Sequence, residues 1–145
     1  MRLEDLQAVM EIGAKSFLHP WSLDALLAEL NNPRALHVVA RLAAEDRLAG
    51  FALAWLVVDE MHINSIAVHP EERRHGVARL LLEDLVRRAL KAGVVEAWLE
   101  VRRSNLAAIG LYESYGFITR GVRPRYYSDT GEDALMMSAA LNADG

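Results

Sequence analysis

The 145-residue sequence contains no cysteine. Disulfide bonds, thiolate metal sites and a cysteine nucleophile are therefore excluded. Histidine offers no recognisable substitute as a metal ligand, because no two of the five histidines have the i, i+4 spacing of a zinc-binding helix. We expect no metal site.

Long apolar runs and an excess of positive charge are also missing. The longest apolar stretch, residues 49–58, is about half the ~20 residues that a membrane-spanning helix needs. The acidic start, MRLED, lacks the apolar segment of a signal peptide. A net charge of −4 gives the chain no general attraction for nucleic acid or an anionic membrane. We expect a cytoplasmic protein in which any phosphate-bearing ligand is held by a local basic cluster.

What is present is enough apolar sequence for one hydrophobic core, with 52% hydrophobic and 25% charged residues. No repeat, low-complexity tract or linker interrupts the chain, so we expect one α/β domain over residues 1–145, with a mixed sheet that begins as an antiparallel meander. Periodicity and capping residues predict helices at 5–16 and 22–31, strands at 35–42, 48–58 and 61–68, a helix at 76–92, a strand at 96–101, a helix at 105–115, and strands at 117–122 and 134–140.

A cluster of basic residues lies where a strand gives way to a helix. Residues 73–79 read RRHGVAR and place three arginines and a histidine beside the predicted helix start. Helix N-termini already carry partial positive charge, so this arrangement is unfavourable unless an anion binds there. Gly76 and Ala78 leave room for a ligand near the backbone. The alternative is a solvated loop neutralised by Glu71 and Glu72. The segment lacks the P-loop and dinucleotide fingerprints, which disfavours nucleoside triphosphates and NAD.

Glu100 lies near the end of a predicted strand with apolar neighbours. Functional sites gather at strand ends in open α/β sheets, and a partly buried carboxylate has a raised pKa that suits a general base. The alternative, a surface glutamate on the polar side of the strand, is the simpler interpretation of the pattern alone. Ser104 and Asn105, which follow, are equally well explained as helix caps.

The predicted helix at 105–115 brings an amide, a small residue and a phenol to one face. Asn105, Ala108 and Tyr112 are spaced i, i+3 and i+7, so their side chains share a stripe. The pattern alone favours core packing for Tyr112 over a role in chemistry.

Taken together, these segments resemble the GNAT superfamily of N-acetyltransferases. Its pyrophosphate-binding motif, Arg/Gln-x-x-Gly-x-Gly/Ala, is matched by residues 73–78. That match is moderately specific by itself, and it becomes strong because residues 64–70, NSIAVHP, precede it as strand four of the family would.

The resemblance narrows to the RimI group of ribosomal-protein alanine N-acetyltransferases and covers the chain from about Asp5 to Ala140. One departure is the family's first strand, which is here reduced to Met1–Leu3. The matching segments are PWS at 20–22, LEVR at 99–102, SN at 104–105, AI at 108–109, LYE at 111–113, YGF at 115–117, RYY at 125–127, EDA at 132–134 and Met136.

This resemblance implies a mixed, mostly antiparallel sheet, flanked by helices and splayed between strands four and five, with acetyl-CoA in the opening. The implied contacts of the acetyl and pantetheine part are the backbone of Ile66, Ala67 and Val68 and the side chain of Asn105. The implied pyrophosphate contacts are Arg73, Arg74, His75, Gly76, Val77, Ala78 and Arg79.

The resemblance also implies a mechanism and an acceptor. Glu100 matches the position of the general base and Tyr112 that of the general acid, and direct attack by the amine needs no covalent enzyme intermediate. The acceptor would be an N-terminal alanine, on a small-subunit ribosomal protein or another protein. Its groove would be walled by the Trp21 loop and by a loop at 123–127 that supplies Arg125, Tyr126 and Tyr127.

Three other functions are alternatives to this one. The same fold also serves acetyltransferases of small-molecule amines, because a fold does not fix the acceptor. A coenzyme A-binding sensor without turnover is disfavoured by the presence of both Glu100 and Tyr112. A nucleic-acid-binding module is disfavoured by the acidic net charge and by the absence of a basic stripe with interleaved aromatics.

Overall fold

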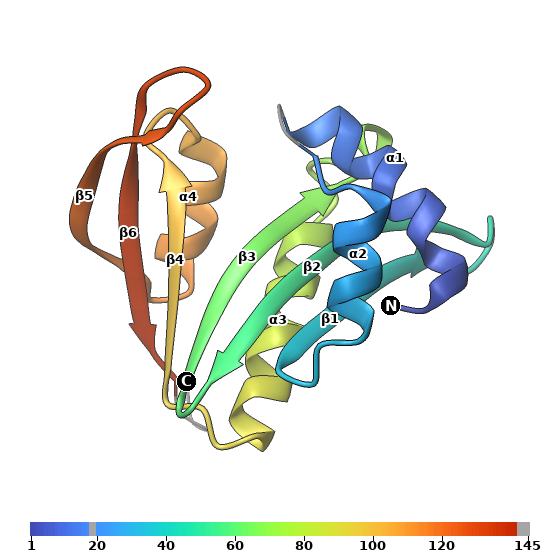
Figure 1. The fold of residues 1–145 in the computed structure, drawn as a ribbon, viewed down its shortest axis with the longest axis horizontal. Helices are drawn as coiled ribbons and strands as arrows, with labels where there is room; N and C mark the ends of the chain where they lie inside the picture. Colours follow the sequence, from blue (N-terminus) through green and yellow to red (C-terminus); the bar gives the residue numbers. More distant parts are fainter. Residues whose placement is uncertain (18–19, 142–145) are drawn as a thin grey trace.

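A computed structural model describes residues 1–17 and 20–141 as helices packed on both faces of one sheet (Figure 1). The elements are η1 (Leu3–Asp5), α1 (Leu6–Ser16), α2 (Leu23–Leu30), β1 (Ala35–Leu42), β2 (Arg47–Val57), β3 (Glu60–Val68), η2 (Pro70–Glu72), α3 (Val77–Lys91), β4 (Glu96–Arg102), α4 (Leu106–Ser114), β5 (Ile118–Tyr127) and β6 (Glu132–Ala140). None of the described helices is both long enough and apolar enough to cross a bilayer.

The described sheet has the strand order β1-β2-β3-β4-β6-β5. β1, β2 and β3 form the predicted antiparallel meander. β3 and β4 pair in parallel, with α3 as the crossover between them, and β4 continues through antiparallel pairing with β6 and then β5. The mixed, mostly antiparallel sheet expected from the sequence is therefore confirmed.

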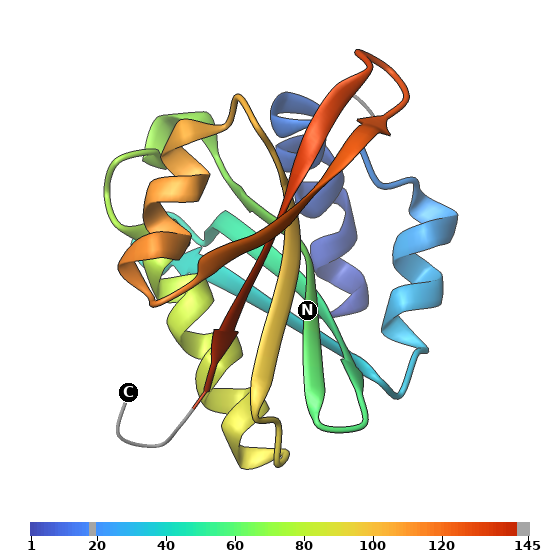
Figure 2. The same ribbon diagram turned by 90° about the vertical axis from the view of Figure 1, so that its left-hand side faces the viewer.

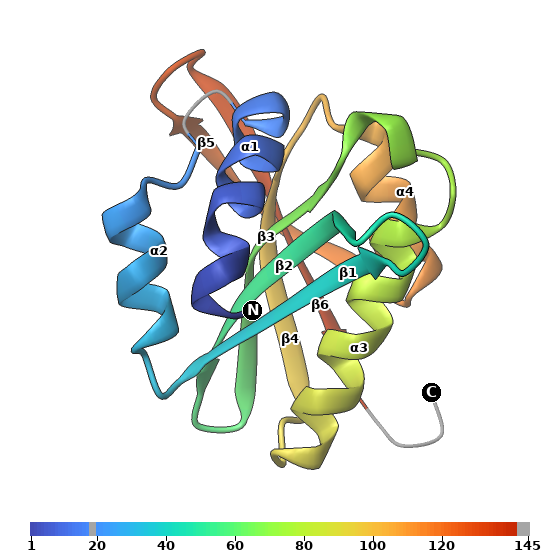
Figure 3. The same cartoon turned by 90° about the vertical axis from the view of Figure 1, so that its right-hand side faces the viewer.

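Two hydrophobic clusters fix the helices on opposite faces of the sheet. On one face, α3 packs Leu81, Leu82 and Leu85 against inward residues of the strands. On the other face, α1 and α2 cover a second cluster that includes Phe51 and Leu53 of β2. Figures 2 and 3 show the ribbons of α1 and α2 on one side of the sheet and that of α3 on the other.

Side chains alternate between the two faces of the sheet along each strand, and this alternation decides which of them are available to a functional site. Met61 and Ile63 of β3 and Leu99 of β4 belong to the α3 cluster. Because neighbouring strand residues point to opposite faces, His62 and Glu100 lie on the face that carries α1 and α2. The same alternation that builds the core therefore brings a histidine and a carboxylate to one surface.

The short first strand expected at Met1–Leu3 is wrong. The chain begins with the 3-10 turn η1 instead, and no strand of the described sheet precedes β1. Asp5 holds this turn, because its carboxylate accepts the Arg2 backbone N–H at 2.9 Å and the Arg41 guanidinium at 2.6 Å. Strands four and five of the family therefore correspond to β3 and β4 here.

The loop expected at residues 123–127 is also wrong, because β5 continues as a strand to Tyr127. Pro124 argues against a strand from sequence alone, since proline cannot donate to a strand ladder. It is tolerated here because β5 is the edge of the sheet. The register with β6 shifts between Arg123 and Tyr127, and Arg125 takes a positive φ of 54° within this irregular stretch.

Candidate active site

The site begins where the pairing of β3 with β4 ends. The two strands are in register only from Glu60–Glu96 to Ile63–Leu99. Beyond that point β3 stays paired with β2 and β4 stays paired with β6, so residues 64–68 and 100–102 border an opening (Figure 1). This separation is the splay between strands four and five that the sequence resemblance implied.

A bulge in β3 accompanies the separation of the strands. Leu53 of β2 is opposite Ser65, whereas Ala54 is opposite Ile63, so Asn64 is the extra residue between them. A bulge bends and twists its strand locally. The bend coincides with the first β3 residue that has left β4, which links the break in pairing to a particular position in the sequence.

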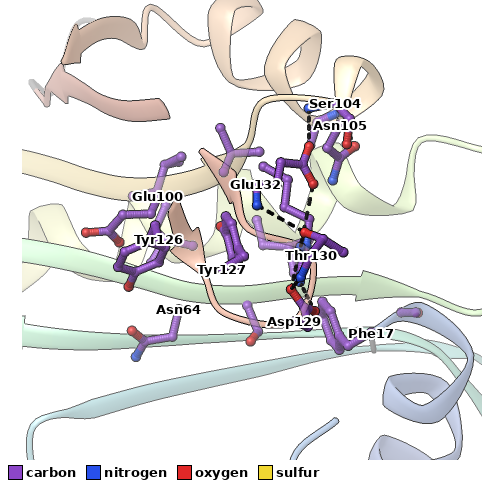
Figure 4. Close-up of a pocket in the computed structure, with 18 of the residues that line it drawn as sticks. Phe17, Asn64, Glu100, Ser104, Asn105, Tyr126, Tyr127, Asp129, Thr130 and Glu132 are labelled. Carbon is purple, nitrogen blue, oxygen red and sulfur yellow. Dashed lines mark hydrogen bonds and ion pairs between the residues drawn. The ribbon is translucent and has the colours of Figure 1, made fainter. Parts of the chain in front are cut away.

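The opening contains a cavity of about 910 Å³, which is within the range of volumes that small-molecule and cofactor sites have (Figure 4). Its walls come from the end of α1, the segment before α2, β3, β4, α4 and the β5–β6 hairpin. The lining includes Phe17, Trp21, Asn64, Ser65, Ile66, Glu100, Arg102, Asn105, Tyr112, Tyr126, Tyr127, Asp129, Thr130 and Glu132.

Glu100 is the carboxylate that the strand separation brings to the cavity. Its Oε2 lies 2.6 Å from Nε2 of His62, on the neighbouring strand. This hydrogen bond lowers the pKa of the Glu100 carboxyl below its ordinary value and outweighs burial, which acts in the opposite direction. The raised pKa expected from the sequence is therefore wrong, because that expectation considered burial without the histidine.

Tyr112 belongs to the core and to the cavity at once. Only 8% of the residue is exposed, and its ring packs against Phe117 with the centroids 5.7 Å apart. Burial raises the pKa of the Tyr112 hydroxyl to about 12, so the phenol keeps its proton throughout the physiological range. The packing interpretation from the sequence is confirmed, and the residue is also placed to meet a ligand.

The end of the β5–β6 hairpin forms one wall of the cavity. Arg102 of β4 holds it, donating to Asp129 at 2.7 Å and lying over the Tyr127 ring at 4.0 Å. Tyr126 and Tyr127 meet edge to face with centroids 5.0 Å apart, and both line the cavity. Arg125 lies on the exposed surface outside the lining, so the hairpin brings the two tyrosines to the site and leaves this arginine away from it.

Trp21 forms part of the opposite wall. Its indole Nε1 donates a hydrogen bond to Ser65 Oγ at 2.9 Å. This bond ties the segment before α2 to β3 on the cavity side of the splay. Trp21 and the two hairpin tyrosines, predicted as acceptor-binding residues, therefore border one cavity from different elements.

The basic turn leads into α3 as the sequence predicts. Gly76 precedes the helix with a left-handed φ of 79°, and the first turn of α3 contains no acidic residue. Arg74, with a φ of 69°, is a second left-handed position in the turn. Arg79 extends across to α4, where it donates to Ser114 at 3.0 Å and lies over the Tyr115 ring. The free N–H groups of the helix and the exposed arginines together suit an anion.

The other predicted contacts of the cofactor lie on β3 and at the start of α4. Ile66 lines the cavity, whereas Ala67 is buried in the hydrophobic cluster that α1 and α2 cover. Antiparallel pairing with β2 occupies only alternate backbone groups, so residues 64–68 keep others on the side of the opening. Asn105 lines the cavity and caps α4 by accepting the Ala108 N–H at 3.2 Å. Both of its sequence interpretations, a cap and a cavity residue, are compatible.

Sequence reasoning missed His62, Asn64 and the acidic residues of the hairpin. The alternation of residues 61–63 already indicates that His62 lies opposite the core side chains. Nothing local indicates that its partner is Glu100, which is 38 residues away in the chain. That contact depends on the parallel register of β3 and β4.

Comparison with known proteins agrees with this geometry. The family model described as Acetyltransferase (GNAT) family matches residues 6–117. The chain belongs to this family. It is thus an acetyl-CoA-dependent N-acetyltransferase, and the resemblance drawn from its motifs is confirmed.

Individual relatives are similar over nearly the whole GNAT domain. The "[Ribosomal protein bS18]-alanine N-acetyltransferase" of Salmonella typhimurium is 39% identical over 140 residues, which cover 95% of this chain and 93% of the relative. The crystal structure of the ribosomal-protein-S18-alanine N-acetyltransferase from Escherichia coli superimposes with a TM-score of 0.88 and 37% identity, covering 100% and 93% of the two chains. Naa20 of Chaetomium thermophilum, solved with a bisubstrate analogue, has a TM-score of 0.86 and 28% identity, with coverages of 97% and 84%.

Replacing Gly76 tests the anion site at the start of α3. Gly76→Glu should reduce acetyl-CoA affinity by ~100-fold or more, because it places a carboxylate among the helix N–H groups that would face the pyrophosphate. Isothermal titration calorimetry measures the effect.

Gly76→Ala is the matched control for that variant. A Cβ at residue 76 meets nothing within 4 Å, so alanine adds the strain of the positive φ without the charge. We expect a much smaller loss of affinity for the alanine variant. Wild-type affinity in the glutamate variant would remove the start of α3 from the binding site.

Proposed function

We propose that this enzyme transfers the acetyl group of acetyl-CoA to the α-amino group at the N-terminus of an acceptor protein, with an alanine of a small-subunit ribosomal protein as the first candidate. The observation that carries the proposal is the cavity between β3 and β4, which has Glu100 and Tyr112 in its lining and aromatic walls on two sides. The name of the Salmonella relative, a ribosomal protein bS18-alanine N-acetyltransferase, supports the choice of acceptor. We place this reaction in the cytoplasm, where ribosomal proteins are made.

The coenzyme A half of the reaction would use β3, α3 and α4. The arginines of the turn and the N–H groups of α3 would neutralise the pyrophosphate, and Asn105 would bond the pantetheine arm. Backbone groups of Ile66, Ala67 and Val68 would pair with the pantetheine and acetyl part as a strand would. A backbone N–H at the opening would then stabilise the tetrahedral oxyanion that forms during attack.

The acceptor half would use the carboxylate at the other side of the opening. An α-amino group has a pKa near 8, so at neutral pH most of it is protonated and cannot attack. Glu100 would attract the ammonium form and receive its proton, directly or through water, leaving the nitrogen lone pair to attack the acetyl carbon. General base help of this kind contributes roughly 10² to 10⁴-fold in rate.

Tyr112 would act on the departing sulfur. Its hydroxyl keeps its proton because burial raises the pKa to about 12. A thiolate with a pKa near 8.5 is a weaker base than this tyrosinate, so complete proton transfer is uphill. We therefore propose that Tyr112 acts as the acid mainly by donating a hydrogen bond while negative charge grows on sulfur.

Removing the Tyr112 hydroxyl separates this role from packing. Tyr112→Phe should lower kcat by ~100-fold because the sulfur loses its donor, while acetyl-CoA affinity and thermal stability change little since the ring still packs against Phe117. Single-turnover kinetics measure the chemical step, and calorimetry provides the binding control. A normal single-turnover rate would return Tyr112 to a packing role alone.

The acceptor is tested with peptides that carry two amines. We expect acetylation of the N-terminal amine of peptides beginning with Ala or Ser, and little on those beginning with Lys or Trp. Trp21 and the hairpin tyrosines line the cavity and would limit the space for the first side chain. An internal lysine has chain extending in both directions and should be excluded by the same walls. Mass spectrometry locates the label.

Free amino acids and polyamines complete that panel. Acetyl groups found mainly on the lysine side chain, or on polyamines alone, would overturn the N-terminal acceptor while leaving the acetyl-CoA site intact.

A further inference from the structure

A bulge brings an asparagine to the apex of the opening between β3 and β4. Asn64 is the extra residue of that bulge. Ile63 and Ile66, on either side of it, both pack in the hydrophobic cluster under α3. In a regular strand, two residues three positions apart point to opposite faces, so the bulge is what leaves two positions between these inward side chains. The residues at those positions, Asn64 and Ser65, both line the cavity.

The usual structural reasons for an asparagine do not apply at this position. The described non-glycine residues with a positive φ lie elsewhere in the chain, so the backbone at residue 64 does not call for asparagine. Within the described part of the chain its side-chain amide has no hydrogen-bond partner, and the amide nitrogen is buried. A buried amide nitrogen without a partner lowers the stability of a fold. The side chain is therefore better explained by a ligand than by the fold.

The oxygen is the end of this amide that a ligand can meet. Asn64 is half-buried and its nitrogen is inaccessible, so the polar contact that it offers to the cavity is through Oδ1. An amide oxygen accepts hydrogen bonds and carries no formal charge. It can therefore hold an N–H group without taking its proton.

Asn64 and Glu100 occupy matching places on the two strands. Ile63 and Leu99 are the last pair of the parallel ladder, and Asn64 and Glu100 are the residues that follow them. Both line the cavity, and Figure 4 shows their side chains extending toward the same end of it. A nitrogen atom held by Glu100 would thus lie beside a second, uncharged acceptor.

These two acceptors suit the three N–H groups of a primary ammonium ion. Glu100, the proposed base, receives the first proton, and the electron pair that stays on nitrogen attacks the acetyl carbon. As the C–N bond forms and the C–S bond breaks, the second proton leaves the nitrogen and the departing thiolate becomes a thiol. The third N–H remains in the amide product. Only this last N–H needs a partner that leaves its hydrogen in place.

We propose that Asn64 is a specificity-determining residue whose Oδ1 accepts the N–H that remains on the acceptor nitrogen, which makes the enzyme selective for primary amines. A secondary amine gives up both hydrogens of its ammonium form during the transfer and keeps none for Asn64. Its additional substituent would occupy the place of that hydrogen. The contact also turns the nitrogen so that its lone pair faces the acetyl carbon. The proposal rests on the acetyl transfer proposed above.

Two peptides that differ by one methyl group on the first nitrogen test the proposal, one beginning with alanine and the other with N-methylalanine. The wild-type enzyme should favour the alanine peptide in kcat/KM. Asn64→Leu replaces the amide with an apolar group of similar shape. It should lower kcat/KM for the alanine peptide by ~30-fold or more and leave that for the N-methyl peptide within ~3-fold, so that selectivity falls by ~10-fold or more. The inherent reactivity of each amine is the same for both enzymes and cancels in this comparison.

Thr119→Val is the matched control. It also makes a polar strand position apolar with little change of shape, and Thr119 lies in β5 outside the cavity lining, so it should keep the wild-type selectivity. Thermal unfolding provides the readout of structure. Asn64→Leu should unfold at the wild-type temperature or above it, because the variant removes a buried nitrogen that has no partner.

Wild-type selectivity in folded Asn64→Leu would overturn the proposal. Should that variant fail to fold, Asn64→Ala gives the same comparison with less bulk, and unchanged selectivity there is equally decisive. A failure of the N-terminal assignment appears in the peptide panel instead. In that case the comparison uses the primary amine that the wild-type enzyme acetylates best and its N-methyl derivative, so the two failures are distinguishable.

Discussion

The incomplete pairing of β3 with β4 is the constraint on which the rest of the site depends. Backbone groups in a sheet need partners, and those of residues 64–68 that face the opening lose theirs when β4 turns away after Leu99. An extended pantetheine chain carries amide groups that can replace the missing strand. The same departure leaves the Glu100 side chain at the border of the opening, in the lining of the cavity. One interruption would thus provide both the proposed place for acetyl-CoA and the proposed place for the base.

Charge divides the opening into two ends with different tasks. The start of α3 combines exposed arginines with helix N–H groups in a chain whose net charge is −4, so attraction for an anion is local. The described cavity lining contains three carboxylates and one guanidinium, and Arg102 is bound to two of those carboxylates. A phosphate ester and an ammonium group would therefore be drawn to different ends and meet at the apex, where His62 and Glu100 make contact.

The sequence predicted most of the structural features that depend on local residue patterns. The predictions failed for features that depend on contacts between segments far apart in the chain. The helix and strand order and the capping by Ser22 follow from periodicity and capping chemistry. The continuation of β5 past Pro124 was missed, because only the place of β5 at the sheet edge makes a proline tolerable. The lowered pKa of Glu100 was missed because its cause is a histidine on another strand. The roles of Glu100 and Tyr112 came from family resemblance, since each residue alone has an ordinary structural explanation.

Amide hydrogen exchange with and without acetyl-CoA tests the central claim, that the ligand completes the interrupted sheet, most directly. Mass spectrometry on peptides that span residues 64–68 and 76–80 reports whether their free N–H groups gain partners. The account predicts slowed exchange in both segments on binding, with little change in β1 at the far edge of the sheet. Unchanged exchange in residues 64–68 under saturating acetyl-CoA would contradict it, because the opening between β3 and β4 would then not be where the ligand lies.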